Sequence, residues 1–390
     1  MSASPVSAFS DGFIEPIDVL SLRGNRLFGE PGSYGESRMP PNPSVVSGAL
    51  RSALLVHRGV DLAAFAGGRV EDELLGRPDA PGPFTVCEVQ PARLLPDASA
   101  EPLFPVPADL VVSGEGEGGL VLRAITPVAP PAGLAGSHAL PLWAALAQSQ
   151  AAKPQSGLRL TADAWQRHLA GTLASRSPQP AKDLTIAEHA LWRTEMRVGI
   201  ALDAQSGRAD DGKLFSTDAL SLMPGVGLLV RVAGAPLADQ VLRLGGDGHG
   251  ARLRPVRAAW PQPDLAAIVA RGRARLILTS PGVFAAGWLP SGAGEPDPRT
   301  GAHFDLGGVS GRIVCAATPR GQVISGFDLV SRKPKPARRA AAIGSVYWID
   351  DLQATPDALG KLAEKGLWQD AEYSHPRRAE GFNRFTWAAW

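Results

Sequence analysis

Two stretches near the beginning of the chain decide its fold: FIEPIDVLSL at residues 13–22 and MPPNPSVVSGALRSALLVHR at residues 39–58. The first is rich in aliphatic side chains and predicts a strand with a basic end at Arg23. In the second, prolines hold the chain extended until a helix begins, which is expected over Val45–Arg58 with Ser44 as its N-cap. A strand, a glycine-containing loop and a helix are the opening of a βαββαβ unit.

Strands alternate with turns and a few helices along the rest of the chain. Periodicity predicts helices over Ala162–Ala170 and Leu237–Leu244. It predicts strands over the following segments: Phe84–Leu95, Leu110–Ser113, Leu120–Ile125, Ala190–Leu202, Val226–Val232, Ala251–Arg257, Arg275–Thr279, Val323–Val330 and Ile343–Ile349. The Ser- and Pro-rich segment 175–182 is typical of a linker. We therefore expect an α+β protein of two domains, residues 1–180 and 181–390, each with antiparallel sheets backed by helices.

The composition is that of a globular protein, with 44% hydrophobic and 20% charged residues and a net charge of +1. Apolar runs such as Leu140–Ala147 are shorter than the roughly 20 residues that cross a bilayer, and the first residues lack the pattern of a secretory signal. We therefore expect a cytoplasmic protein without a membrane partner. Two cysteines cannot build a disulfide framework, and the seven histidines show no ligand spacing, so neither a metal nor another cofactor is expected.

Charge is segregated along the chain although the total nearly cancels. Ten acidic residues and two arginines lie over Glu71–Glu117, whereas seven arginines and two aspartates lie over Arg243–Arg275. Another seven basic residues lie over Arg312–Arg339 with a single aspartate. A GC-rich genome also explains the excess of arginine over lysine, 32 to 7, but clusters of cations beside glycine and proline are what a phosphate-binding surface needs.

The sequence GGDGHG at Gly245–Gly250 is the first candidate for a ligand-binding loop. It lacks the Lys-Ser/Thr pair of a P-loop and the GxGxxG spacing of a dinucleotide loop. Two interpretations stay open: a plain turn that ends the preceding helix, or backbone amides that hold an RNA phosphate beside flanking arginines. These arginines are Arg243, Arg252, Arg254 and Arg257.

A second candidate is SRKPKPARR at Ser331–Arg339, which has five cations in nine residues and two prolines that oppose helix formation. It is either a solvated loop or an extended segment against a nucleic-acid backbone. In the second case, each phosphate neutralised on a single strand adds about 0.7 to the exponent of the salt dependence.

His57, on the first helix, is the one candidate for catalysis. A histidine beside bound RNA can act as a general base toward a 2′-hydroxyl. The sequence positions no second acid or base, so a histidine without chemistry is the simpler interpretation. The acidic stretch Glu71–Glu117 supports a third interpretation of the function. In that case the chain is a module that docks a protein partner and binds no RNA.

Several stretches carry a family resemblance. The chain opens with IEPIDVLSLRGNRLFG and MPPNPSVVSGALRSALL, and further stretches follow in order: LFPVPADLV (103–111), EMRVGIALD (195–203), DGKLFS (211–216), LRLGGDGHGA (242–251), LTSPGVFAAGWLP (278–290) and ISGFDLVSRKPKPARRAAAIGSVYW (324–348). Together they resemble the third subunit of the type III-B, or Cmr, CRISPR effector complex, a repeat-associated mysterious protein (RAMP).

The resemblance implies two ferredoxin-like (RRM-like) domains, no nuclease activity of its own, and binding of the 5′ handle of the guide RNA (crRNA). It also implies two protein partners, the large polymerase subunit and the first backbone subunit of the Cmr complex. A related group of RAMP endoribonucleases, which process guide RNA, gives the alternative with His57 as general base. The residues expected at the RNA are Arg23, Arg38, Ser44, Arg51, Gly245, Gly246, His249, Arg252, Lys333, Lys335, Arg338 and Arg339, and His249 stands where the resemblance predicts a basic side chain.

Overall fold

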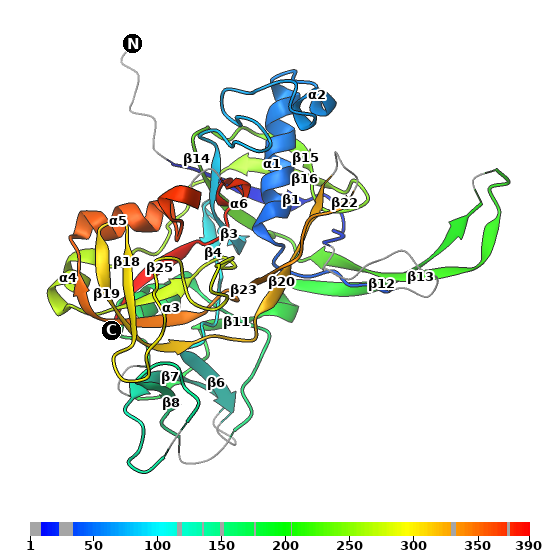
Figure 1. Ribbon diagram of the computed structural model, residues 1–390. Coiled ribbons are helices and arrows are strands. Elements are labelled where there is room, and N and C mark those ends of the chain that lie inside the picture. Colours follow the sequence, from blue (N-terminus) through cyan, green and yellow to red (C-terminus); the bar gives the residue numbers. More distant parts are fainter. Residues whose placement is uncertain are drawn as a thin grey trace.

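The structure is a computed structural model in which two large antiparallel sheets and a few helices form an α+β fold, as the sequence predicted (Figure 1). It describes residues 9–22, 34–114, 119–134, 136–148, 152–174, 177–203, 205–328, 333–372 and 375–390. None of the helices in these ranges is long and apolar enough to span a membrane.

The first sheet has six strands and is built around β1. In spatial order the strands are β15, β16, β1, β14, β3 and β4, with the bounds Gln240–Arg243, Gly250–Pro255, Phe9–Pro16, Val226–Ala233, Thr85–Leu94 and Ala100–Pro102. β1 pairs antiparallel with β14 on one side and with β16 on the other. Across the β1–β14 pair, Arg231 donates two hydrogen bonds of 2.8 Å to Asp11, and Trp260 Nε1 donates a third at 3.1 Å.

This sheet draws on both sides of residue 180, where the domain boundary was expected. β14, β15 and β16 follow this residue in the sequence, yet β14 and β16 pair with β1, which precedes it. β15 replaces the helix predicted over Leu237–Leu244. That prediction is wrong because Val241 is exposed while Leu242 is buried, and this alternation continues on both sides with the two-residue period of a strand.

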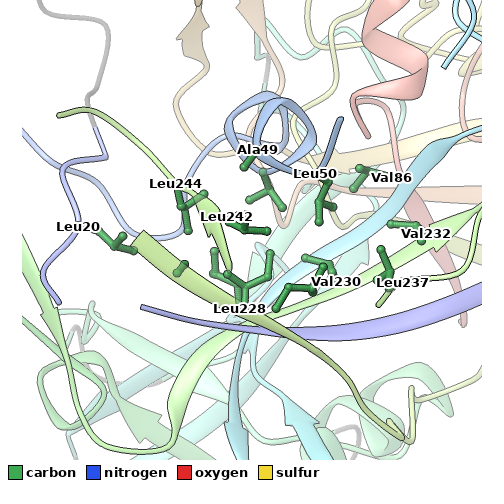
Figure 2. Close-up of a cluster of buried hydrophobic side chains, with 14 of the residues drawn as sticks. Leu20, Ala49, Leu50, Val86, Leu228, Val230, Val232, Leu237, Leu242 and Leu244 are labelled. Carbon is green, nitrogen blue, oxygen red and sulfur yellow. The ribbon is translucent and has the colours of Figure 1, made fainter. Parts of the chain in front are cut away.

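Helix α1 (Pro43–His57) covers one face of the first sheet, and the core lies between them (Figure 2). Leu50 of the helix and Val230 of β14 are both buried there. Burial of one such side chain stabilises the fold by about 1.5–3 kcal/mol, so the sheet and the helix depend on each other.

The predicted start of α1 was two residues too late. Asn42 is its N-cap and Pro43 its first residue, where the missing N–H of proline leaves no hydrogen bond unmade. Ser44 is therefore not the cap, and it lies in the first turn instead.

The second sheet has five strands in the order β18, β19, β24, β17 and β25, with the bounds Ala302–Leu306, Val309–Ala317, Val346–Gln353, Ala274–Leu278 and Phe385–Ala389. Helices α4 (Leu265–Arg271) and α5 (Pro356–Lys365) pack on one face, where Leu359 and Trp387 share a core. A polar contact joins the two sheets, because Thr279 after β17 donates to Glu88 of β3 at 2.9 Å.

The other face of the second sheet packs against an insertion between β4 and β12. Its elements are β5 (Phe104–Pro105), β6 (Leu110–Gly114), β7 (Leu120–Val128), β8 (Trp143–Leu146), β9 (Leu158–Leu160), α3 (Ala162–Leu169), β10 (Gln179–Pro180) and β11 (Thr185–Ala187). Trp165 of α3 stacks on Phe104 with 4.5 Å between the ring centroids, and both share a core with Trp348 of β24. The predicted hairpin of β6 and β7 and the predicted helix at α3 are confirmed.

A buried ionic network fastens this insertion to the second sheet. Nε2 of His168 in α3 lies 3.1 Å from both Asp109 and Arg275 of β17, and Arg275 donates to the carbonyl oxygen of His168 at 2.6 Å. Burial alone would raise the pKa of Asp109, but its interactions with His168 and Arg275 outweigh this effect and hold the pKa at about 2. Burial lowers the pKa of His168 below its ordinary 6.5.

Both pKa values are lower in the folded protein than in the unfolded chain. The network therefore stabilises the fold at neutral pH. Its contribution falls first as the pH drops below about 6.5, through His168, and again below about 4, through Asp109.

A long hairpin projects away from the two sheets (Figure 1). It consists of β12 (Trp192–Leu202) and β13 (Ala209–Leu222), and β2 (Tyr34–Gly35) pairs parallel with β13 at Ser216 and Thr217, midway along that strand. The remaining elements are short: α2 (Leu62–Ala66), β20 (Gln322–Ile324), β21 (Phe327–Asp328), β22 (Lys333–Pro334), β23 (Arg338–Ala340), α6 (Pro376–Ala379) and the 3₁₀ turns Glu188–Ala190 and Asp370–Glu372.

Asp109→Ala should lower the free energy of unfolding by about 3–5 kcal/mol, because it leaves Arg275 buried without its counter-ion. Urea unfolding at pH 7 measures this loss. Asp350→Ala, which removes the partner of the more exposed Arg273, is the control and should cost at most about 1 kcal/mol. Equal losses in the two variants would contradict the role of the network.

Candidate nucleic-acid interface

The glycine-rich turn between β15 and β16 lies against the segment that follows β1. The amide of Gly246 donates to the carbonyl oxygen of Ser21 at 2.8 Å, and the amide of Leu244 donates to that of His249 at 2.9 Å. Gly245 has a φ of +80°, and a Cβ there would lie 2.5 Å from the carbonyl oxygen of Ser21. Glycine is therefore required for this close approach, and the Gly246 amide is engaged within the protein.

The chain leading into α1 meets the same place. The amide of Arg38 donates to the carbonyl oxygen of Leu22 at 2.9 Å. The hydroxyl of Ser37 accepts from the amide of Leu22 at 3.2 Å and donates to the carbonyl oxygen of Asp218 in β13 at 2.7 Å. The glycine-rich turn, the start of α1 and the root of the hairpin thus converge on Ser21 and Leu22.

The stretch SRKPKPARR, described from residue 333 on, is called the basic segment. It comes close to α1 at the turn that follows α6. Lys335 lies 3.2 Å from the carboxylate of Glu380, and a Cβ on Gly381 would lie 3.4 Å from the Cβ of Pro43. Burial lowers the pKa of Arg51, two turns further along α1, while the charge of Glu380 acts to raise it. The first turns of α1 and the basic segment therefore share one acidic residue.

His375 and Arg377, which the sequence did not single out, belong to the cluster formed by the basic segment, Glu380 and the first turns of α1. His375 caps α6 by accepting from the amide of Arg377 at 3.1 Å, and its ring stacks on Trp368 with 5.6 Å between the centroids. Burial and the charges of Arg338 and Arg377 lower the pKa of His375, so its ring is neutral at pH 7. The sequence HPRR at residues 375–378 carries a signal for them, since proline favours the first position of a helix and the residue before it caps the helix.

The predicted cationic side chains differ in whether a carboxylate lies within ion-pair distance. Three of them are paired with carboxylates: Arg38 with Glu36 at 3.0 Å, Arg252 with Asp239 at 3.0 Å and Lys335 with Glu380 at 3.2 Å. The pairs of Arg38 and Arg252 are exposed and contribute about 0–1 kcal/mol, so a phosphate can displace their carboxylates at little cost, whereas Glu380 is largely buried. Within the residues that the structure describes, no carboxylate partner is found for the exposed Lys333, Arg338 and Arg339.

The basic segment is partly ordered as strand rather than as a simple connection. β23, which contains Arg338 and Arg339, pairs antiparallel with β20, and Lys333 begins the short strand β22. Because successive residues of a strand point to opposite faces, Arg338 and Arg339 extend from opposite faces of β23.

The remaining predicted residues do not all join this cluster. Arg23 lies outside the described residues. Ser44 is half-buried in the first turn of α1. His57 is exposed at the other end of α1, about 20 Å along the helix axis from Ser44. Among the described residues, no group of three or more His, Cys, Asp or Glu side chains could hold a metal ion.

Comparison with known proteins gives the class of this chain. Residues 13–390 match the sequence profile of a family of CRISPR-associated proteins, Cas_Cmr3. The chain is similar to one in the cryo-EM structure of the type III-B Cmr-beta bound to cognate target RNA and AMPPnP, with a TM-score of 0.50, 12% identity and coverage of 96% of this chain and 95% of the other. A second Cmr-beta structure, bound to cognate target RNA, gives a TM-score of 0.46 at 12% identity and covers 96% of both chains. No curated protein sequence matches.

A match over nearly the whole chain shows that the protein is CRISPR-associated. It belongs to the Cmr3 family, which confirms the resemblance drawn from the quoted stretches. At 12% identity, the likeness to the first solved structure supports the fold alone.

Gly245→Ala should lower the free energy of unfolding by at least about 1 kcal/mol more than Gly248→Ala. Both glycines have positive φ, so both variants strain the backbone, but a Cβ at Gly248 would meet open space. Urea unfolding of the two variants measures the difference. If both lose the same amount, the close approach of Gly245 to Ser21 is not what requires glycine.

Proposed function

We propose that this chain is a non-catalytic scaffold subunit of a type III-B CRISPR (Cmr) ribonucleoprotein that grips the 5′ handle of the crRNA. The observation that carries the proposal is the convergence of three segments, the start of α1, the glycine-rich turn and the root of the hairpin, beside a basic segment with exposed cations. Membership of the Cmr3 family supports it independently.

The chemistry of the basic segment fits a single-stranded RNA backbone. Lys333, Arg338 and Arg339 are exposed, and the prolines between them prevent the chain from closing into a helix. His375 lies near Arg338 and can contact the same strand as a neutral donor, and Arg51 lies near Glu380, the partner of Lys335. Such contacts bind phosphates without reading sequence, so they suit the fixed position of a handle.

The strand orders support the interpretation of both sheets as ferredoxin-like. β16, β1, β14 and β3 follow the 4-1-3-2 order of a βαββαβ unit, with α1 in the place of its first helix. β25, β17, β24 and β19 follow the same order, with α5 in the place of the second helix. Each unit thus keeps one helix of two. On this interpretation the two units meet between β16 and α4, at residues 256–264, rather than at residue 180.

The proposal includes the large polymerase subunit and the first backbone subunit of the Cmr complex as protein partners, in the cytoplasm. A subunit at the 5′ end of a guide has such neighbours on two sides. Two separate exposed regions, the projecting hairpin and the insertion on the second sheet, are available to contact them.

The alternative, a guide-processing endoribonuclease with His57 as general base, has weaker support. His57 lies at the far end of α1 from the cluster of cations, beside Arg58, which pairs with Asp72 at 2.9 Å. A general base must lie within hydrogen-bonding reach of the hydroxyl that it deprotonates.

Replacement of Lys333 and Arg339 by alanine should weaken binding of a synthetic handle RNA and flatten its salt dependence. Each lost phosphate contact reduces the slope of log K against log salt by about 0.7, so the double variant should lose about 1.4. Fluorescence anisotropy over a range of NaCl concentrations measures both quantities. Arg271→Ala, at an exposed arginine of α4, is the control and should leave the slope unchanged. A slope that the double variant shares with the wild type would refute the proposed site.

Incubation of the purified chain with a repeat RNA should yield stable binding and no cleavage, and His57→Ala should bind with the same affinity. Denaturing gel electrophoresis of the RNA detects any product. Cleavage that disappears in His57→Ala would overturn the non-catalytic role in favour of the endoribonuclease.

A further inference from the structure

Arg377 and Glu380 lie three residues apart at α6, yet they do not complete an ion pair. The distance from Arg377 Nη1 to Glu380 Oε2 is 4.0 Å, beyond the range of a hydrogen bond. Both atoms are buried and lack a hydrogen-bond partner among the described residues. The two side chains are only 8% and 15% exposed, so solvent does not replace the missing bond. Polar atoms left unpaired at this depth destabilise the free protein.

Lys335 explains why the pair is incomplete. Its ammonium group lies 3.2 Å from Oε1 of Glu380 and holds the carboxylate away from Arg377. The charge of the same carboxylate acts to raise the pKa of Arg51 and Arg377, against the effect of burial. One carboxylate therefore serves three cations, and Arg377, the most deeply buried of them, has an unmade hydrogen bond.

The main chain around Lys335 is held independently of this ammonium group. The amide of Lys335 donates to the carbonyl oxygen of Gly326 at 2.8 Å, and its carbonyl oxygen accepts from the hydroxyl of Ser325 at 2.8 Å. The carbonyl oxygen of Ser325 in turn accepts from Arg377 Nη2 at 3.3 Å. The ammonium group can thus exchange its partner while the main chain of Lys335 and the side chain of Arg377 stay in place.

We infer that Glu380 is an internal competitor of the RNA, which holds Lys335 in the free protein and transfers to Arg377 when a backbone phosphate binds Lys335. This inference rests on the proposed function, which brings RNA to the basic segment. A carboxylate and a phosphodiester carry the same charge, and both accept hydrogen bonds from an ammonium group. A shift of the carboxylate by about 1 Å then brings Oε2 within hydrogen-bonding range of Nη1.

The exchange makes Lys335 easier for RNA to occupy than a plain ion pair would be. Lys335 loses one anion and gains another, while Arg377 gains a hydrogen bond to a charged group in a buried place, where such bonds are strong. This new bond offsets part of the cost of separating Lys335 from Glu380. The exchange takes place where the basic segment meets α1, because Gly381, the next residue, approaches Pro43.

The alternative is that Glu380 only anchors the structure. Removal of a residue that only holds α6 and the basic segment together should weaken RNA binding, because the cations lose their positions. Removal of a competitor should have the opposite effect, since Lys335 is then free for the phosphate. The direction of the change in affinity therefore distinguishes the two roles.

Glu380→Gln keeps the shape of the side chain and removes its charge, so it should bind a synthetic handle RNA about two- to fivefold more tightly than the wild type. Fluorescence anisotropy of the full-length chain measures the affinity, at a temperature where circular dichroism shows both proteins folded. Weaker or unchanged binding would overturn the inference.

The salt dependence of the same variant tests the exchange itself. The slope of log K against log salt should equal that of the wild type, because Lys335 contacts a phosphate in both complexes. A slope steeper by about 0.7 would show that Lys335 reaches the phosphate only when Glu380 is gone. Glu380 would then block the contact, and the transfer to Arg377 would be refuted.

A matched control separates competition for Lys335 from a general gain of positive charge. Glu372→Gln removes one negative charge from the same region, where the charge of Glu372 acts on His375. In a Lys335→Met background the gain from Glu380→Gln should disappear, whereas any gain from Glu372→Gln should persist. If the gain from Glu380→Gln persists without Lys335, it is a general charge effect and contradicts the inference.

The position of Glu380 in the bound state gives a test that needs no variant. In a cryo-EM structure of the assembled complex with its guide RNA, the carboxylate of Glu380 should lie within about 3.2 Å of Arg377, and the ammonium group of Lys335 should contact a phosphate. A carboxylate that stays on Lys335 contradicts the inference. If the wild-type chain binds no handle RNA, the proposed function fails, whereas RNA binding that does not respond to Glu380→Gln refutes the exchange alone.

Discussion

Strand β1 takes both of its neighbours from a segment more than two hundred residues further along the chain. Phe9 pairs with Ala233 of β14, and Pro16 pairs with Ala251 of β16. Two parts of the candidate RNA site, the glycine-rich turn and the root of the hairpin, depend on this pairing. It places the glycine-rich turn against Ser21. It also places the base of the β12–β13 hairpin, which precedes β14, beside the start of α1.

The electrostatics of the site depend on the cations at its surface. The cations at its surface are exposed, and their carboxylate partners hold them weakly, so an RNA backbone can replace those partners. The network of Asp109, His168 and Arg275 is the opposite case, because its charges are buried and none can leave without a large loss of stability. One set of ion pairs is thus suited to exchange with a ligand, and the other is suited to hold the insertion in place.

Local sequence signals predicted the elements whose side chains follow a clear period. The helices α1 and α3 and the hairpin of β6 and β7 follow from periodicity and turn residues. β15 was mistaken for a helix because a segment of eight residues with three leucines fits both periods, and only its pairing with β16 decides between them. The extent of the first sheet could not be derived from local signals, since strand pairing over two hundred residues leaves no periodic trace.

The same limit applies to the site. Charge clustering found the basic segment and the glycine-rich turn, but not that Glu380 and Gly381 join the basic segment to α1. His375 and Arg377 escaped notice because their role depends on the packing of α6 against other elements. The stretch from Glu195 to Asp203 was quoted for its resemblance, whereas the exposure of its alternate aliphatic residues is visible only in three dimensions.

The late arrival of β14 and β16 also governs how the protein emerges from the ribosome. At about 5–20 residues per second, roughly 10–40 s separate the synthesis of β1 from that of β14. During this interval β1 has no central partner, and the leucines of α1 have only part of a sheet to cover them. The nascent chain is thus at its most aggregation-prone until about residue 255, and faster translation or chaperone binding over this region shortens or covers that exposure.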